Sequence, residues 1–510
     1  MYTVSGHSNR LSSNMATSNG APHTAEAVGA PPSVASIKQA AQEQVVDPYN
    51  VSGGTDEHGN TKAIDYEALR MKFNTPPLTD ELLKRFEKVT GKPPHRLMRR
   101  QLFFSHRDFD KILDHYEKYG FFMLYTGRGP SSDSMHLGHA VPFLFTKELQ
   151  ELFDIPLVIM LTDDEKFYHT RNKNQGEAKP GTMVDDYIQF ALQNAKDIIA
   201  LGFDQKKTFI YTDYTYMGGH FYQNITEFET LLTNNQVRGA MGFDGSTNIG
   251  LNSYPAKQCV AAFPTSYPAL FGRNDWDLKT RGTRSKDIAA IPTLIPCAID
   301  QEPYFRLLRD NCGRMQCPSP KTALILSKFL TALQGPGGKM SASDPTSAIF
   351  MSDTPNQIKN KINKYAFSGG GATLEEHKEH GGNPDVDVAF AYLSYFLESD
   401  EELKEIETSY RAGTLMTGDL KKKCIAELQK FIGEFQEKRK LVTEEVMEDF
   451  MTPRKLEFNG NPHIEVSIPA PPSDDKQADK KSGKKDKKKA DKDSSKQDLP
   501  VREKKEEPSS

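Results

Sequence analysis

The chain has 510 residues, which is enough for two or three domains. Hydrophobic residues make up 37% of it and charged residues 26%, and its formal net charge of −4 excludes a general polycation, so any contact with nucleic acid must come from local basic patches. The five cysteines have no C-x-x-C spacing, which argues against a zinc site and a disulfide framework, and no apolar run is long enough to span a membrane.

Residues 1–45 are rich in Ser, Asn, Ala, Gly and Pro and are predicted to be a disordered extension. They lack the apolar core of a signal peptide, whereas a transit peptide stays open as an alternative because no acidic residue precedes Glu26. The turn-rich residues 46–60 indicate a hairpin at the start of the ordered chain. Helices are predicted over 79–91 and 108–120, each ending at a glycine.

After these helices, strand-like and helix-like runs alternate. Amphipathic helices are expected over 140–153 and 185–202, between short apolar runs. The apolar runs predict strands at 121–125, 155–161, 207–213 and 292–299. This alternation favours an α/β fold with a mostly parallel sheet covered by helices on both faces. Such sheets bind ligands beyond the carboxyl ends of their strands, near the point where the strand order reverses.

The strand-like runs stop near residue 352, which divides the ordered chain into a first domain over 46–352 and a helical domain over 353–458. Residues 388–397 and 418–435 supply the amphipathic helices of the second domain. The lysine-rich residues 459–510 cannot bury a core and are predicted to be a disordered tail. The tail is either a solvating segment or an RNA-binding appendage whose affinity falls with salt.

The stretch PSSDSMHLGH (130–139) is a loop of small and polar residues between a predicted strand and a predicted helix. The N-terminus of a helix presents N–H groups and a partial positive charge, which suits a phosphate. His136 and His139 are spaced to reach the same phosphate chain, and Gly138 leaves room for a ring to stack on the backbone. An isolated H-x-x-H is more often an ordinary capping or packing pair.

A second loop, GGKMSASDP (337–345), is also flanked by glycine. Lys339 is suited to contact phosphate oxygens, and Ser341 and Ser343 to donate hydrogen bonds. A lysine followed by serines is weak evidence alone. The two loops together, about two hundred residues apart around an alternating α/β region, predict a nucleotide triphosphate site.

HLGH followed by KMSAS resembles the two signature motifs of the class I aminoacyl-tRNA synthetases. With YTGRGPSSDSMHLGH, LTDDEK, LIPCAIDQEPYFR and INKYAFSGG, the chain is similar over about residues 46–458 to the tryptophanyl-tRNA synthetases of the eukaryotic cytoplasm. The resemblance implies a Rossmann-type catalytic domain, a helical anticodon-binding domain and a homodimer. It implies ATP with Mg²⁺, L-tryptophan and tRNA(Trp) as substrates, no tightly bound cofactor, and no role for a membrane.

The resemblance also assigns roles to individual residues. The catalytic group is expected to be His136, His139, Lys339, Ser341 and Ser343. ATP is expected to bind at Thr126, Arg128, Gly129, Pro130, Gly138 and Met340. Tryptophan is expected to contact Tyr125, Met160, Glu165, Gln258 and Gln301.

The chain departs from the family at two of these regions. Met160 stands where some relatives have a glutamine that helps to hold the indole N–H, which predicts weaker recognition of that group and more reliance on stacking. The stretch DPYNVSGG (47–54) is similar to a segment that covers ATP in eukaryotic members, with Tyr49 in place of the usual tryptophan. For the anticodon, Lys361, Asn363 and Lys364 are only candidates.

Three other functions stay open from the sequence. A small adenylyltransferase also uses an H-x-G-H loop, but the lysine loop and the long helical domain disfavour it. A tyrosine-specific synthetase is disfavoured by the GRGPSS and KMSASDP context. A catalytically retired RNA-binding or signalling protein on the same fold is disfavoured because His136, His139, Lys339 and Glu165 are all present.

Overall fold

The computed structural model describes residues 42–58, 60–273, 282–340 and 344–459. The predicted N-terminal extension and the lysine-rich tail lie almost wholly outside the described residues.

A six-stranded sheet forms the centre of the molecule, with the strand order β3-β8-β7-β4-β5-β6. Neighbouring strands are parallel except at one edge, where β3 runs antiparallel to β8. The strands are β3 (Phe103–Arg107), β4 (Met123–Arg128), β5 (Leu157–Leu161), β6 (Thr208–Thr212), β7 (Thr293–Ala298) and β8 (Ala323–Ser327). The predicted α/β fold with a mostly parallel sheet is therefore confirmed.

Helices cover both faces of this sheet. Every residue of β5, β6 and β8 is buried, and since successive side chains of a strand point to opposite faces, both faces must be covered. The helices of this part are α1 (Tyr66–Phe73), α2 (Asp80–Thr90), α3 (Arg96–Arg99), α4 (Phe109–Tyr119), α5 (Leu137–Phe153), α6 (Asp163–Lys173), α7 (Val184–Ala200), α8 (Asp213–Tyr216), α9 (Gly219–Glu229), α10 (Asn234–Met241), α11 (Ile249–Val260), α12 (Lys286–Ala289) and α13 (Glu302–Asn311).

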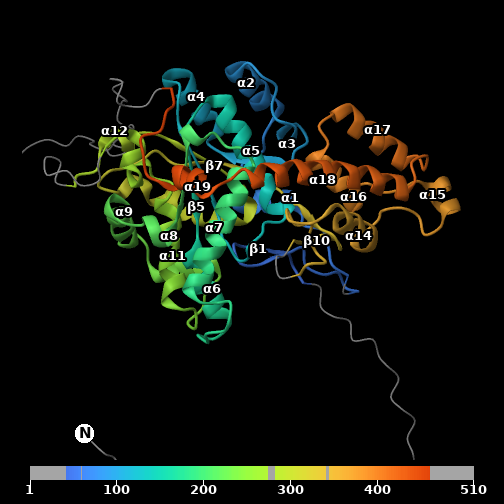
Figure 1. Cartoon of the computed structure of the whole chain (residues 1–510), viewed down its shortest axis with the longest axis horizontal. Coiled ribbons are helices and arrows are strands. Elements are labelled where there is room, and N and C mark those ends of the chain that lie inside the picture. The colour runs from blue at the N-terminus through green and yellow to red at the C-terminus, as the bar shows by residue number, and fades with distance from the viewer. Residues whose placement is uncertain (1–41, 59, 274–281, 341–343, 460–510) are drawn as a thin grey trace, which may run out of the picture.

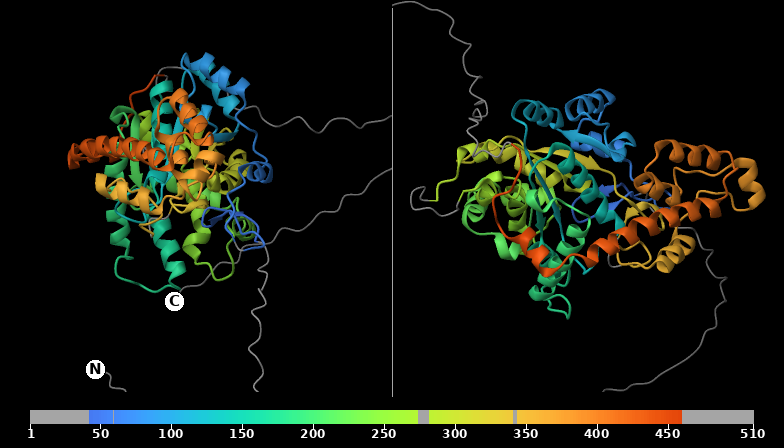
Figure 2. Two further views of the ribbon diagram at one scale, coloured as in Figure 1. Left: turned by 90° about the vertical axis from the view of Figure 1, so that its right-hand side faces the viewer. Right: turned by 45° about the horizontal axis from the view of Figure 1, so that its top comes forward.

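The C-terminal part of the described chain is helical and projects to one side of the sheet (Figure 1). Its helices are α14 (Pro355–Tyr365), α15 (Leu374–His380), α16 (Val388–Phe396), α17 (Asp400–Arg411), α18 (Thr417–Lys440) and α19 (Glu444–Met451). Helix α18 runs from this helical part back to the sheet, where it packs on α7, and α19 packs on β6 (Figure 2). Of the helices in the described part of the chain, none combines the length and the apolar character needed to cross a bilayer.

Two small antiparallel pairs lie beside the sheet. One is formed by β1 (Val45–Val46) and β2 (Val51–Ser52), as the predicted hairpin required, and the other by β9 (Thr331–Ala332) and β10 (Gly335–Lys339). The backbone N–H of Gly53 donates to the carbonyl of Gly337 at 3.2 Å, so the two pairs are joined. The N-terminal segment and the lysine loop therefore meet although they are far apart in sequence.

The boundaries of several elements differ from the predicted ones. Strand β4 begins at Met123 and continues to Arg128. Helix α5 begins at Leu137 rather than at residue 140, so His136 caps the helix and Leu137, Gly138 and His139 lie in its first turn. Strands β3 and β8 were not predicted. Each has five residues, and β3 mixes polar with apolar side chains, so neither gives a long periodic signal.

Candidate active site

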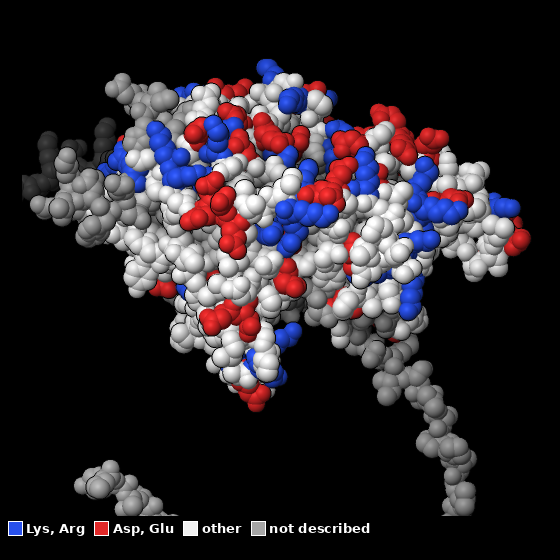
Figure 3. All heavy atoms as spheres, in the orientation of Figure 1, with Lys and Arg blue, Asp and Glu red and all other residues white. Residues whose placement is uncertain are grey.

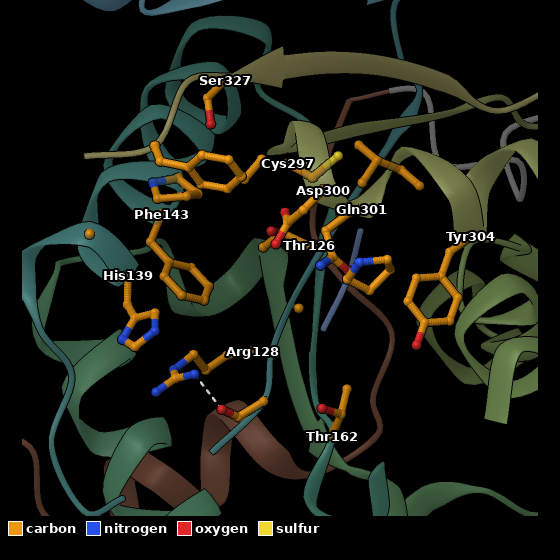
Figure 4. A pocket seen from close by; sticks show the side chains of 18 of the residues that line it. Thr126, Arg128, His139, Phe143, Thr162, Cys297, Asp300, Gln301, Tyr304 and Ser327 are labelled. Atoms are coloured by element: carbon orange, nitrogen blue, oxygen red, sulfur yellow. Dashed lines mark hydrogen bonds between the residues drawn. The ribbon is translucent and has the colours of Figure 1, made fainter. Parts of the chain in front are cut away.

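A cavity of about 280 Å³ lies beyond the carboxyl ends of β4 and β7. The chain runs outward from β4 to β5 and β6 and then returns to β7 on the other side of β4, so this is the point where the strand order reverses. The end of β4, the turn after β7 and the first turn of α5 all contribute to its wall. Figure 4 shows His139 and Arg128 on one side of the cavity and Gln301 and Tyr304 on the other.

Most of the predicted site residues line this one cavity. They are Tyr125, Thr126, Arg128, Gly129, His136, Gly138, His139, Glu165, Gln258, Gln301 and Met340. Pro130 and Met160 are not among the lining residues. Ser341 and Ser343 lie outside the described residues, and Lys339 is the last residue of β10, where its backbone pairs with Thr331. The roles of all the predicted site residues, those that line the cavity and these five, stay predictions.

The two histidines are held together at the start of α5. His136 precedes the helix with an extended backbone and is paired with Phe350 across an isolated bridge, while His139 lies in the first turn. Their rings stack with centroids 3.5 Å apart. The histidines therefore form one stacked unit at a helix N-terminus, although His136 is the capping residue rather than a helical one.

Gly138 allows the lysine loop to approach this unit. A Cβ atom added at Gly138 would lie 3.2 Å from the His136 ring and 3.4 Å from the sulfur of Met340. The absence of a side chain thus lets β10 and the HLGH turn close on the same space. The HLGH turn and Met340 of the lysine loop, about two hundred residues apart in sequence, therefore line one cavity.

The hydroxyl of Tyr125 is the centre of a buried hydrogen-bond chain. It donates to the sulfur of Met160 at 3.1 Å and accepts from Nε2 of Gln258 at 3.2 Å, while Oε1 of Gln258 accepts from the hydroxyl of Tyr254 at 2.8 Å. Burial raises the pKa of Tyr125 well above its ordinary value, so the phenol keeps its proton. Met160 therefore acts on the cavity through Tyr125.

Arg128 is a buried cation at the cavity wall. Its Nη1 donates to the carbonyl of Gly129, whereas Nε and Nη2 have no hydrogen-bond partner in the described structure. Burial lowers the pKa of the guanidinium to about 10, which leaves it charged at neutral pH. A buried arginine with unused donors that lines a cavity is suited to bind an anion there.

Glu165 lies on α6, directly after β5, and Nζ of Lys166 contacts its Oε2 at 2.9 Å. A Cβ added at Gly129 would lie 2.1 Å from Cε of Lys166, so the glycine makes room for this lysine to cross the cavity wall. Directly before Gln258 on α11, Lys257 pairs with Asp164 at 2.5 Å. Helix α11 is thereby fixed to the TDDEK segment, which places Gln258 and Glu165 on the same cavity.

Several lining residues were missed by the sequence analysis. They include Thr162, Lys166, Tyr254, Tyr304, Ser327 and Lys328. Thr162 follows β5, and Ser327 and Lys328 lie at the end of β8, so the rule that ligands bind beyond strand ends would have found them once the strands were known. Tyr254 and Tyr304 lie on helices and give no such signal.

Tyr49, in the segment predicted to cover ATP, lines the cavity. Its hydroxyl lies 2.7 Å from that of Tyr304, and its ring stacks on His169 with centroids 5.2 Å apart. Of the anticodon candidates, Lys361 pairs with Asp353 at 2.7 Å and is largely buried by this contact, whereas Asn363 and Lys364 are exposed. Lysine and arginine side chains gather near α18 on the face drawn in Figure 3, with acidic side chains beside them.

Comparison with known proteins agrees with this geometry. A family model described as class I tRNA synthetases (W and Y) matches residues 117–433. The chain belongs to this family. The cytoplasmic tryptophan–tRNA ligase of Schizosaccharomyces pombe is 53% identical over 418 residues, which cover 82% of this chain and 99% of that protein. The human cytoplasmic enzyme is 48% identical over 421 residues, 82% of this chain and 83% of its own length.

Solved structures agree on the fold of this synthetase. The tryptophanyl-tRNA synthetase of Giardia lamblia superposes with a TM-score of 0.68 at 41% identity, covering 77% of this chain and 97% of that one. A parasite tRNA synthetase in a product-bound crystal gives a TM-score of 0.69 at 42% identity.

Proposed function

We propose that this synthetase is a cytoplasmic tryptophan–tRNA ligase. It activates L-tryptophan with ATP to tryptophanyl-AMP and pyrophosphate, and then transfers tryptophan to the 3′ end of tRNA(Trp). The observation that carries the proposal is that the HLGH turn, Tyr125 and Met340, the residue after β10, line one cavity. The identity to cytoplasmic tryptophan–tRNA ligases supports the choice of amino acid and compartment.

The first step needs no protein nucleophile. The carboxylate of tryptophan attacks the α-phosphate of ATP, a bond to the β-phosphate oxygen breaks, and pyrophosphate leaves with the electron pair. The protein has to align two anions and stabilise the negative charge that grows on the phosphates. His136, His139, Arg128 and the N-terminus of α5 supply donors and positive charge on one side of the cavity.

ATP enters with Mg²⁺ as its counter-ion, and the ion belongs to the substrate. Thr126, Gly129, Pro130, Gly138 and Met340 form the nucleotide side of the proposed site. Lys339, Ser341 and Ser343 act from the lysine loop on the phosphates. A loop on a short hairpin between glycines is suited to close on ATP and to tighten in the transition state.

Tryptophan lies on the other side, between Tyr125, Glu165, Gln258 and Gln301. Tyr125 accepts the indole N–H, because its own proton is directed to Met160 and a lone pair remains beside the one used by Gln258. Glu165 binds the ammonium group, and the two glutamines orient the amino acid. Buried polar groups left unpaired by phenylalanine or tyrosine reject those substrates.

The proposed domains follow the predicted boundaries, with catalysis over 46–352 and anticodon reading over 353–458. An anticodon is single-stranded and splayed, and is read by hydrogen bonds and stacking. The exposure of Asn363 and Lys364 on α14 supports them as candidates for this contact. Residues 459–510 add a non-specific electrostatic contact to RNA through their lysines.

The enzyme is proposed to act as a homodimer. Tyr214, Tyr222 and Ile249 are large apolar side chains with 39%, 59% and 84% of their surface exposed. They belong to α8, α9 and α11, which lie together on one side of the molecule (Figure 1). Sedimentation should give twice the monomer mass, and Ile249→Lys should shift it toward the monomer; an unchanged mass in the variant would remove this face as the interface.

Aminoacylation of purified tRNA transcripts tests the function. The chain should charge tRNA(Trp) with tryptophan in the presence of ATP and Mg²⁺, and should leave tRNA(Tyr) uncharged with either amino acid. Charging of tRNA(Tyr) with tyrosine would favour the tyrosine-specific alternative. Binding of tRNA without any charging would favour the catalytically retired one.

A further inference from the structure

Met135, the residue before His136, is held at both of its backbone polar groups. Its N–H donates to Oδ2 of Asp197 on α7 at 3.3 Å. Its carbonyl accepts from the N–H of Met351 at 2.8 Å. The N–H of Leu137 donates to the carbonyl of Ile349 at 2.9 Å. Residues 135–137 therefore lie against the segment that follows the lysine loop.

Both partners of Met135 are bound in turn by the last turns of α18. Arg439 Nε donates to Oδ1 of Asp197 at 2.5 Å. One turn earlier, Nε2 of Gln436 donates to the carbonyl of Met351 at 2.9 Å. Residues three apart on a helix share one face, so a single face of α18 reaches Met135 from two sides.

Asp197 also lies within electrostatic reach of a second cation, Arg128. Asp197 is 2% exposed, and the charges of Arg439 and Arg128 both act on it. The Nε and Nη2 groups of Arg128 have no hydrogen-bond partner in the described structure. A buried carboxylate that loses its cation is strongly unfavourable. Without Arg439, Arg128 is the arginine whose charge still acts on Asp197.

We propose that Arg439 is a positioning residue for nucleotide activation, which holds the Asp197 carboxylate on Met135 and away from Arg128. The proposal rests on the proposed function, since Arg128 is assigned there to the phosphates of ATP. It places the control of the HLGH turn partly on α18, a helix that begins at Thr417 in the helical part and ends against α7 (Figure 2). A ligand that moves the last turn of α18 changes the hold on Met135.

Three variants test this role in the full chain. Arg439→Gln removes the cation, Arg439→Lys keeps the charge with poorer geometry, and Arg439→Gln combined with Asp197→Asn removes both charges. Lys440→Gln is the matched control, because Lys440 is exposed and pairs with Glu437 on the same helix. The readouts are equilibrium binding of ATP alone, equilibrium binding of tryptophan alone, and kcat and KM in ATP–pyrophosphate exchange.

Arg439→Gln should lower kcat/KM for ATP by roughly 10- to 100-fold and weaken ATP binding, since small displacements of positioning groups have effects of this size. Tryptophan binding should stay within about twofold of wild type, because Tyr125 and Gln258 are not connected to Met135 by the hydrogen bonds described above. Arg439→Lys should lose less, and the double variant should recover part of the ATP binding because no uncompensated carboxylate remains to draw Arg128 away.

Unchanged ATP binding in Arg439→Gln would overturn the proposal. So would an equal loss of tryptophan binding, or a double variant more defective than Arg439→Gln, since both are what a merely structural tether produces. A wild-type chain that binds ATP but shows no exchange with tryptophan would refute the proposed function instead, and the ATP-binding series would still decide the role of Arg439.

Discussion

At the scale of single residues, the hydroxyl of Tyr125 decides what the amino-acid side of the cavity can recognise. Its proton is directed to a thioether, which is a weak acceptor, and one of its lone pairs accepts from Gln258. Met160 therefore fixes the direction of the hydroxyl without reaching the cavity lining. In the proposed site the indole N–H has one neutral partner, the hydroxyl of Tyr125, so the weak recognition expected from Met160 stays a prediction.

This arrangement predicts a small penalty for a substrate that lacks the indole N–H. An N-methylindole analogue of tryptophan should bind about fivefold more weakly than tryptophan, because one neutral hydrogen bond contributes about 1 kcal/mol. Competitive inhibition of ATP–pyrophosphate exchange measures this ratio. Near-complete loss of binding by the analogue would mean that further groups hold the indole N–H.

Gly138 is a second position where a single residue controls the site. Gly138→Ala places a methyl group 3.2 Å from the His136 ring and should lower kcat/KM for ATP by roughly 10-fold, because the ring must shift by a few tenths of an ångström. The control is Gly239→Ala on α10, where no atom lies within 4 Å of the added Cβ. Equal exchange rates in the two variants would show that the His136 ring position is unimportant.

At the scale of elements, the sequence predicts the sheet better than the cavity. The runs that became β4 to β7 are apolar and short, and the alternation with helices made the parallel sheet and the strand-end site predictable. Only part of the polar lining of the cavity could be predicted from the sequence. Lys166 lies against Gly129, and Lys328 lies over the rings of Tyr66 and Phe104. These partners are far from the two lysines in the sequence, so sequence spacing carries no information on the contacts.

Helix α3 shows how an element boundary carries a pH dependence. Nδ1 of His95 accepts from the N–H of Leu97 at 3.2 Å, which caps the helix. Burial, with the charges of Arg96, Arg99 and Arg100, lowers the pKa of His95 from 6.5 to about 3. The folded chain thus keeps this ring neutral while the unfolded chain protonates it. The contribution of the neutral His95 ring to the free energy of unfolding is present above pH 6.5, and it is lost as the pH falls from there toward 3.

His95→Asn keeps a capping oxygen and removes this titration. When the pH is lowered from about 7 to about 5, the melting temperature of the wild-type chain should therefore fall further than that of the variant. The extra loss corresponds to roughly 1 to 2 kcal/mol in the free energy of unfolding. His380→Asn is the control, since His380 is exposed. Parallel losses of melting temperature in wild type and His95→Asn would show that His95 titrates normally in the folded chain.

At the scale of the whole molecule, the chain joins a sheet that holds the cavity to a helical part that lies to one side of it (Figure 1). Helix α18 connects the two and contacts α7 near its C-terminal end. Amino-acid activation is proposed to take place in the cavity at the sheet, with Arg439 of α18 as a positioning residue, whereas the proposed tRNA contacts involve the helical part and residues 459–510. The two steps of the reaction should therefore be separable by changes to the C-terminal tail.

Deletion of residues 460–510 should leave ATP–pyrophosphate exchange unchanged and weaken tRNA binding by roughly 10-fold at low salt, with a difference that disappears at high salt. A chain in which the lysines of 480–492 are replaced by glutamine tests the charge alone and should behave like the deletion. A tRNA affinity that is the same in all three chains at low salt would assign the tail a role other than RNA binding.

The central claim is that two signature loops and a tryptophan-sized polar pocket form one activating site. ATP–pyrophosphate exchange driven separately by tryptophan, tyrosine and phenylalanine tests it most directly, because the assay requires both substrates to react in the same cavity and does not require tRNA. The account predicts exchange with tryptophan alone. Exchange driven by tyrosine, or no exchange with any of the three amino acids, would contradict it.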